Sequence, residues 1–148
     1  MNYLLDTNIF IAYCRKGATS RKIESDFLNS KSSNTLFVSV VTLGELDSFV
    51  KRNGIGQRKR NLINELLEKC YVVDINIQEI IDKYGDIDAF SQAKIKIPNH
   101  EFTARNMGKN DLWIAAITSH FNLTLLTTDK DFSHLHQAYL PVAYVQPA

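Results

Sequence analysis

The sequence predicts an α/β fold, in which a short parallel sheet of about five strands is flanked by helices on both faces. Short apolar runs alternate along the chain with segments of helical periodicity. These runs are partly β-branched, as expected for parallel strands covered on both faces. The length of 148 residues suits one compact domain, so we expect a single domain over residues 1–148.

The elements follow in order along the chain. Five apolar runs are the predicted strands: 3–5, 36–40, 71–73, 123–126 and 142–145. Helical periodicity predicts helices over three sets of apolar positions: 62, 63, 66 and 67; 77, 80, 81 and 84; and 112, 113, 116, 117 and 120. A further short helix is expected through residues 9–11. The segment 94–108 has no clear pattern, and Met107-Gly108 predicts a stop before a helix that begins at Asn110.

Composition excludes several classes of protein. The 17 Lys and Arg residues nearly balance the 16 Asp and Glu residues, which argues against a protein that coats nucleic acid by bulk positive charge. No apolar run approaches the roughly 18 residues that a membrane span needs, and the N-terminus lacks the basic and apolar regions of a signal peptide. We therefore expect a cytoplasmic protein with no membrane contact. Cys14 and Cys70 match no zinc or redox pattern, and both are expected to be buried thiols.

Two carboxylates in the first third lie where a strand is expected to meet a helix. Asp6 follows the first strand, and ligands of an open parallel sheet lie outside the carboxyl ends of its strands. Asp6 can equally be the N-cap of the helix that follows, a common role for Asp. Glu45 fits a capping box with Thr42. On a helical wheel, however, Glu45 points away from the apolar side, so it is also free to face a site.

Two motifs in the last third carry further carboxylates. Asn110 suits an N-cap, and Asp111 would lie in the first helical turn, where the helix dipole favours an anion. Because the rest of this helix is nearly all apolar, a carboxylate at its start is costly unless it is paired or bound to a metal. After the fourth strand, Thr128 and Asp131 can form a cap. Asp129 is the better site candidate because it lies nearest the strand end, and Asp131 is the reserve.

These carboxylates can converge, because the carboxyl ends of parallel strands meet at one edge of a sheet. Clustered carboxylates cannot all stay ionised unless positive charge lies among them. Hard oxygen ligands in a partly wet cleft suit Mg²⁺ or Mn²⁺, and the absence of a His/Cys set argues against zinc. The sequence therefore predicts a divalent-metal site.

Four segments give the chain a resemblance to the PIN-domain ribonucleases, and within that family to the VapC-type toxins of bacterial toxin–antitoxin pairs. The segments are 5–8, 41–46, 110–116 and 126–132, and they match in order, spacing and residue type over nearly the whole chain. The resemblance implies a PIN-like fold. Many family members have a shorter segment than 94–108, so the rim of the cleft and the choice of target do not carry over.

The resemblance also assigns roles to individual residues. The family's metal-binding, catalytic acids fall on Asp6, Glu45, Asp111 and Asp129. The supporting positions are Thr7, Asn8, Asn110 and Thr128, together with Asp131. What is implied is an endoribonuclease that uses Mg²⁺ or Mn²⁺ to hydrolyse RNA phosphodiesters, with a cognate antitoxin as protein partner and a homodimer as its oligomeric state.

Basic residues around the cleft are expected to contact the RNA. The four candidates are Lys109, Arg105, Arg15 and Lys16. A second group lies within ten residues and is interpreted as a solvated loop and helix start, with RNA contact as the alternative: Lys51, Arg52, Arg58, Lys59 and Arg60. The four histidines receive no role, and Trp113 and Phe121 are expected in the core.

Other functions fit the sequence less well. A haloacid-dehalogenase-like phosphatase requires a second Asp two residues after the first, where this chain has Asn8. A nucleotide-binding module requires a glycine-rich fingerprint or a phosphate-binding loop, and neither is found. Two alternatives stay open: a PIN-fold nuclease that acts on DNA, and a non-catalytic PIN-like domain used for binding or assembly.

Overall fold

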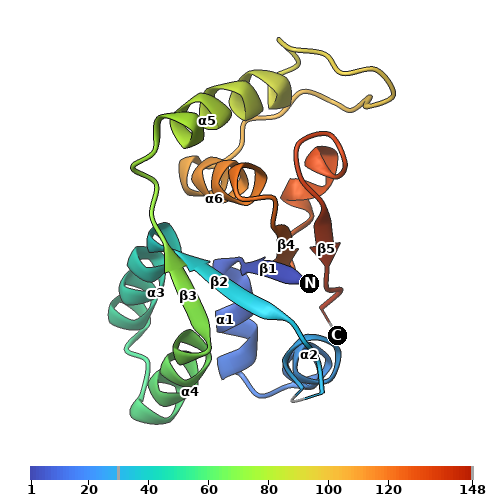
Figure 1. Cartoon of the computed structure of the whole chain (residues 1–148). Coiled ribbons are helices and arrows are strands. Elements are labelled where there is room, and N and C mark those ends of the chain that lie inside the picture. The colour runs from blue at the N-terminus through green and yellow to red at the C-terminus, as the bar shows by residue number, and fades with distance from the viewer. Residues whose placement is uncertain (30, 148) are drawn as a thin grey trace.

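The computed structural model describes residues 1–29 and 31–147, which form a parallel sheet between two layers of helices (Figure 1). The strand order is β3-β2-β1-β4-β5, and every neighbouring pair is parallel. The bounds are Asn2–Leu5 for β1, Thr35–Ser39 for β2, Cys70–Val73 for β3, Thr124–Thr127 for β4 and Val142–Tyr144 for β5. The predicted fold class is confirmed, and each strand overlaps its predicted run.

The strand order places a topological switch point between β1 and β4. The chain moves outward from β1 to β2 and β3, then returns to add β4 and β5 on the other side. In the register of the central pair, Leu5 lies opposite Leu126, and the backbone N–H of Asp6 donates to the Leu126 carbonyl at 2.9 Å. Ligands of open α/β sheets bind outside the carboxyl ends of the strands at such a point. Asp6 therefore lies at the switch point.

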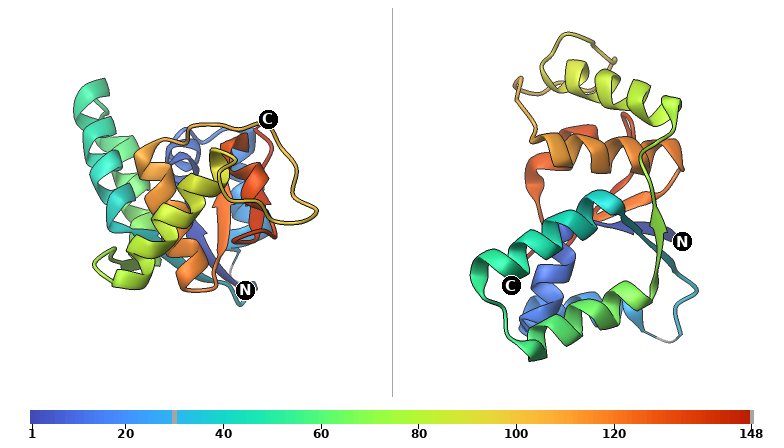
Figure 2. Two further views of the ribbon diagram at one scale, coloured as in Figure 1. Left: turned by 90° about the horizontal axis from the view of Figure 1, so that it is seen from above. Right: turned by 90° about the vertical axis from the view of Figure 1, so that its left-hand side faces the viewer.

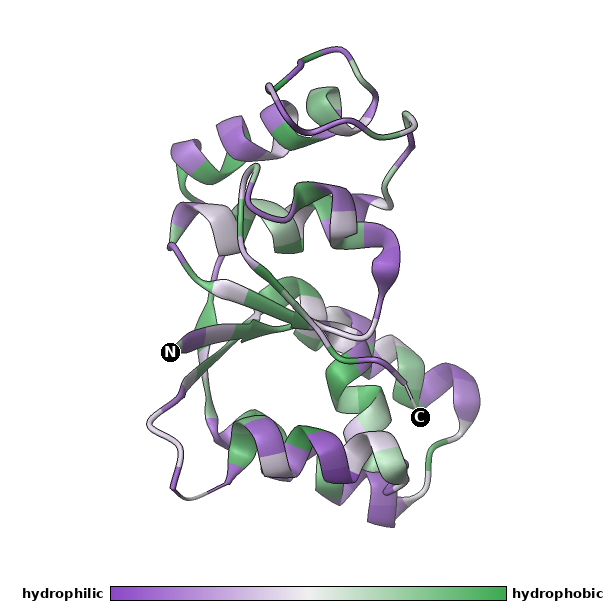
Figure 3. Cartoon of the chain, turned by 90° about the vertical axis from the view of Figure 1, so that its right-hand side faces the viewer, coloured by the Kyte–Doolittle hydropathy of each residue, from purple (hydrophilic) through white to green (hydrophobic). Residues whose placement is uncertain are grey.

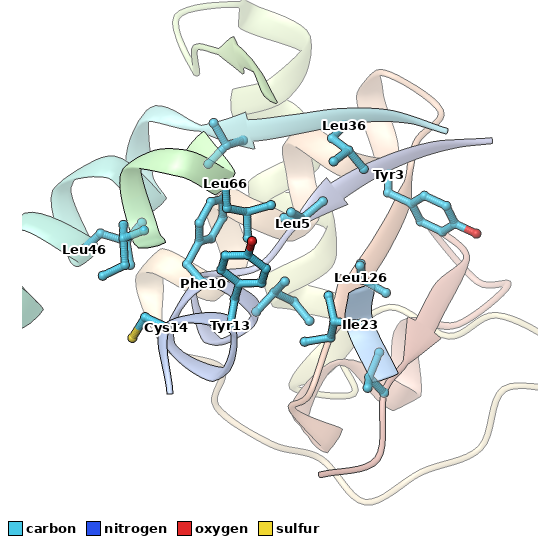
Figure 4. Packing of buried hydrophobic residues seen from close by; sticks show 14 residues of the cluster. Tyr3, Leu5, Phe10, Tyr13, Cys14, Ile23, Leu36, Leu46, Leu66 and Leu126 are labelled. Carbon is cyan, nitrogen blue, oxygen red and sulfur yellow. The ribbon is translucent and has the colours of Figure 1, made fainter. Parts of the chain in front are cut away.

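One face of the sheet is covered by helices from the first half of the chain. They are α1 (Thr7–Cys14), α2 (Ala18–Ile23), the π-helical turn η1 (Glu24–Leu28) and α4 (Gln57–Glu68). Figure 4 shows the core on this side, where Phe10 and Tyr13 of α1 and Leu66 of α4 gather beside Leu5. Burial of such large apolar side chains stabilises the fold by roughly 1.5–3 kcal/mol each.

The opposite face is covered by helices from the second half. These are α5 (Gln78–Ser91), α6 (Lys109–His120) and the 3₁₀ helix η2 (Lys130–Leu135). Their core includes Leu4, Phe90, Ile114 and Phe132, all with no exposed surface. Helix α6, in which seven of twelve residues are buried, lies directly beneath α5 in Figure 1. Helix α5 carries both hydrophobic and hydrophilic residues in Figure 3.

Helix α3 (Val40–Asn53) leaves the end of β2 at the edge of the sheet where Asp6 lies. Its N-cap is Ser39, whose hydroxyl accepts a hydrogen bond from the Val41 N–H at 3.0 Å. The predicted capping box of Thr42 and Glu45 is therefore wrong, because the helix begins two residues before Thr42. The helix ends at Gly54, whose φ of 56° is the left-handed conformation that glycine adopts without strain.

Some expectations on burial are wrong. Strand β3 is an edge strand, and Tyr71 and Val72 are 67% and 56% exposed, so this strand is not covered on both faces. Ile81 on α5 is 47% exposed, and Cys70 is only half-buried, whereas Cys14 is buried as expected. Helices α2 and η1 had no clear periodicity in the sequence. None of the helices among the described residues has the length and apolar character that crossing a membrane requires.

Candidate functional site

Asp6 lies at the centre of the candidate site and is 3% exposed. Its Oδ1 accepts a hydrogen bond from the Thr7 N–H at 2.8 Å, which makes it the N-cap of α1. Its Oδ2 accepts from the Thr127 hydroxyl at 2.7 Å. Burial raises the pKa of Asp6 to about 6, the two hydrogen bonds oppose the rise, and the charges of Glu45 and Asp129 add to it. The capping role and the site role therefore coexist.

Thr7 joins Asp6 to the carboxylate of Glu45. The Thr7 hydroxyl lies 2.7 Å from Glu45 Oε1 and 3.1 Å from the hydroxyl oxygen of Thr42. Because one hydroxyl carries one hydrogen, and the carboxylate is the nearer and stronger acceptor, Thr7 donates to Glu45. The glutamate is thus held toward Asp6 instead of reaching back to a helix cap.

Asp111, Asp129 and Asp131 form the other half of the acidic group. Each offers a carboxylate oxygen within 4.8 Å of the other two. Asp111 is the third residue of α6, whose N-cap is Gly108, so the expected N-cap at Asn110 is wrong. Asp129 is itself the N-cap of η2 and accepts from the Asp131 N–H at 2.9 Å, so the cap expected from Thr128 does not form.

The two halves belong to one electrostatic environment. Burial raises the pKa of Asp111 to about 7, and the charges of Asp6, Asp129, Glu45 and Asp131 raise it further. Within residues 1–29 and 31–147, none of these five acids takes part in a salt bridge. A group of partly buried carboxylates without a cationic side chain fits a bound metal ion. Every donor in the group is a carboxylate oxygen, which suits a hard divalent cation.

A cleft of about 690 Å³ opens from Asp6, Glu45 and Asp111 toward α3. Its lining includes Thr7, Asn8 and Asn110, three of the predicted supporting residues. Trp113 also lines it and packs against Tyr84 with ring centroids 4.4 Å apart. Trp113 is partly buried against the core, as expected, and at the same time forms part of the cleft wall. The corresponding expectation for Phe121 is wrong, because this ring is exposed.

Arg52 is a residue of the cleft that the sequence interpretation placed in a solvated group. It lines the cleft, and its Nε donates to the Ser48 hydroxyl at 3.0 Å. Arg52 follows Glu45 by seven residues, or two helical turns, so the two lie on the same face of α3. This seven-residue spacing from Glu45 is the feature of the sequence that could have identified Arg52 as a residue of the cleft.

A second hollow of about 440 Å³ extends this surface. It shares Asn8, Ile11 and Phe49 with the cleft and continues to Arg15 and Thr128. The site therefore opens onto two connected hollows with an arginine beside each.

The remaining predicted basic residues lie at different distances from the acids. Lys109 is exposed at the first position of α6, two residues before Asp111. Arg105 donates from Nη1 to the backbone carbonyl of Asp131 at 3.4 Å. Lys16, by contrast, pairs with Glu24 at 3.1 Å and lies over the Tyr13 ring, so the structure does not bring it to the acidic group.

Comparison with known proteins agrees with this geometry. A family model described as PIN domain matches residues 3–137. The chain belongs to the PIN domain family. PIN domains are generally nucleases, and the expected resemblance is confirmed at the level of the family. Comparison with curated protein sequences gives no match.

Solved structures of VapBC complexes share the fold. A chain of VapBC2 from Rickettsia felis, solved with a DNA fragment from its promoter, superposes with a TM-score of 0.73 at 23% identity, covering 97% of this chain and 98% of that one. VapBC-1 from nontypeable Haemophilus influenzae gives 0.69 at 25% identity, with coverage of 97% and 98%. A toxin–antitoxin complex from Klebsiella pneumoniae gives 0.66 at 18% identity, covering 99% of each chain.

Proposed function

We propose that this PIN-domain chain is a metal-dependent endoribonuclease and the toxin of a VapBC-type toxin–antitoxin pair. The observation that carries the proposal is the acidic group itself. The carboxylates of Asp111, Asp129 and Asp131 lie within 4.8 Å of one another, and the charges of Asp6 and Glu45 act on Asp111 and help to raise its pKa. A partly buried set of acids that makes no salt bridge within the described part of the chain is costly for folding alone. Its presence therefore supports a role in binding a metal.

The residues of the site would divide the work as follows. Asp6, Glu45, Asp111 and Asp129 hold Mg²⁺ or Mn²⁺, with Asp131 at the outer side of the group. When bound, such an ion lowers the pKa of a coordinated water and offsets negative charge on the phosphate. Thr127 and Thr7 orient the carboxylates of Asp6 and Glu45. Arg52, Arg15, Lys109 and Arg105 supply positive charge where an RNA backbone would pass.

The partner proposals rest on the relatives. Three solved structures that share the fold are VapBC or other toxin–antitoxin complexes, which supports a cognate antitoxin for this chain. The homodimer stays a prediction. Light scattering coupled to size exclusion tests it, and a strictly monomeric protein at micromolar concentration would contradict it.

The central experiment measures cleavage of matched RNA and DNA oligonucleotides with Mg²⁺. We expect wild-type protein to cleave the RNA, and Asp6→Asn and Asp111→Asn to lose that activity. Asp47→Asn is the matched control, because Asp47 is exposed on α3 and pairs with Lys51 outside the cleft. Undiminished cleavage by either site variant would contradict the assignment. Cleavage of DNA alone would favour a DNA nuclease, and no cleavage of either would favour a non-catalytic domain.

A further inference from the structure

The segment that joins α5 to α6 passes beside the acidic group. Residues 92–108 contain no helix or strand and run from the end of α5 down to the start of α6, as the right-hand view of Figure 2 shows in yellow and gold. The segment is tied near its C-terminal end, because the Arg105 N–H donates to the Ser91 carbonyl at 2.8 Å. Arg105 is therefore held next to the last residue of α5.

Ser91 is also the centre of a buried polar contact with η2. Its hydroxyl oxygen lies 2.7 Å from Nε2 of His134 and 3.2 Å from Sδ of Met107. Ser91 has no exposed surface and His134 is 9% exposed. A buried polar group that loses its partner destabilises the fold, so each of these two side chains depends on the other.

Aromatic rings enclose this contact. Phe90 of α5 lies parallel to the His134 ring with centroids 6.3 Å apart, and Phe102 of the segment packs on it at 5.0 Å. The end of α5, the segment and η2 are therefore packed as one unit around His134. His134 is thus a buried polar side chain that the proposed metal chemistry does not use.

The same unit carries part of the acidic group. Asp131 lies on η2, and its carboxylate is within 4.8 Å of those of Asp111 and Asp129. The Nη1 of Arg105 donates to the backbone carbonyl of Asp131 at 3.4 Å. A guanidinium has five N–H donors in a planar fork that matches a phosphate. Among the described residues Arg105 makes no salt bridge, so its charge and its remaining donors stay available.

We propose that Ser91 and His134 are positioning residues, which fix the 92–108 segment so that Arg105 binds a backbone phosphate of the RNA next to the acidic group. This inference rests on the proposed ribonuclease function. It assigns a purpose to the segment in which this chain departs from shorter family members, and it makes Arg105 part of the substrate site.

The test separates substrate binding from turnover in RNA cleavage. We expect Arg105→Ala to raise KM about tenfold or more, with a smaller effect on kcat, because the substitution removes a charge-assisted hydrogen bond to the phosphate. The dependence of log affinity on log salt concentration should become shallower. Its slope should decrease in magnitude by about 0.7, the value for one phosphate contact on a single strand. Lys96→Ala is the matched control, since Lys96 is an exposed cation on the same segment.

The positioning role predicts a specific pattern of non-additivity. His134→Leu should raise KM in the wild-type background and should have no further effect on KM in an Arg105→Ala background. His134→Gln, which keeps a polar nitrogen near the position of Nε2, should restore most of the wild-type KM. Equal effects of His134→Leu in both backgrounds, or an Arg105→Ala variant with wild-type KM and salt slope, would overturn the proposal.

Two measurements keep this inference separate from the proposed function. The first is binding of a single-stranded RNA oligonucleotide in EDTA, followed by fluorescence anisotropy, which needs no cleavage. The second is hydrogen exchange of the Arg105 amide, which should be protected in wild type and in His134→Gln but not in His134→Leu. If wild type binds RNA but does not cleave it, the ribonuclease proposal fails while these measurements still decide the role of Arg105. The inference would be contradicted if Arg105→Ala kept the wild-type affinity for RNA and His134→Leu kept the wild-type protection of the Arg105 amide.

Discussion

The hydroxyl of Thr127 donates to the carboxylate of Asp6 at 2.7 Å and so joins two residues 121 positions apart in the sequence. The same hydroxyl oxygen accepts the backbone N–H of Asp129 at 3.0 Å. Thr127 has no exposed surface. This one side chain therefore links the acid that follows β1 to the acid that follows β4, at the switch point of the sheet.

Replacing Thr127 with valine should remove the hydrogen bond to Asp6 without leaving a cavity in the core, because the two side chains have similar volumes. The variant loses the hydrogen bond that lowers the pKa of Asp6, so Asp6 should hold its proton to higher pH. We expect the pH profile of RNA cleavage to move to higher pH, and the free energy of unfolding to fall by about 1–3 kcal/mol, because buried polar groups lose their partner. Thr35→Val is the matched control, because Thr35 pairs with Asn2 at the other end of the sheet from Asp6, and it should change both quantities much less. Equal effects of the two substitutions would contradict the linking role of Thr127.

The stability of the metal-free protein should fall as pH rises from about 4 to about 7. The folded pKa values of Asp6 and Asp111, about 6 and about 7, lie above the ordinary value of 3.8, so the folded state holds more protons than the unfolded state in this window. His134 acts in the opposite direction, because burial and the charge of Arg105 lower its pKa to about 4. Above pH 6.5 only the acids contribute, and the fall should be clearest there.

Thermal unfolding in EDTA, measured between pH 4 and 8, checks this dependence. A metal ion requires ionised ligands, so Mg²⁺ or Mn²⁺ should stabilise the protein increasingly as pH rises through 6 to 7. A Tm in EDTA that rises from pH 6.5 to 7.5 would be inconsistent with the raised pKa of Asp111.

Asp111→Asn should abolish RNA cleavage and raise the free energy of unfolding of the metal-free protein. The amide removes a partly buried negative charge from beside four other carboxylates, so the metal-free protein should gain on the order of 1 kcal/mol at pH 8 after allowing for solvent screening. The variant should also lose RNA cleavage and the stabilisation by Mg²⁺. Chemical denaturation with and without Mg²⁺ measures both effects. A destabilised variant that still responds fully to Mg²⁺ would show that Asp111 is a structural residue.

Arg52→Ala should weaken RNA binding by roughly threefold to tenfold, the effect expected for a partly solvated contact to a phosphate. Arg52 lines the cleft beside Glu45, whereas its neighbour Lys51 pairs with Asp47 on the exposed side of α3. Lys51→Ala is therefore the control, and RNA binding at two salt concentrations is the measurement. If the two substitutions weaken binding equally, the effect is one of net charge and not of position.

The sheet could be predicted from the sequence because its strands are short apolar runs, and Asp6, Asp111 and Asp129 follow strand ends or open a helix. The cap positions were wrong for α3, α6 and η2, because several residues near each start can cap, and backbone geometry selects Ser39, Gly108 and Asp129. The exposure of β3 could not be read from its apolar residues, since an edge position depends on strand order.

Other parts of the site depend on tertiary contacts that the sequence does not display. Thr127 was passed over in favour of Thr128, because only the register of β1 and β4 puts Thr127 next to Asp6. Ser91 and His134 belong to segments without a shared motif and meet only in the folded chain.

The most direct test of the metal site is calorimetric titration of the protein with Mn²⁺ at pH 8, where the ligands are ionised. Wild type and Asp47→Asn should bind Mn²⁺ with the same affinity. Asp6→Asn and Asp111→Asn, compared as folded proteins, should each lose that binding. Binding by Asp6→Asn and Asp111→Asn at the wild-type affinity would contradict the claim that the four acids form one metal site.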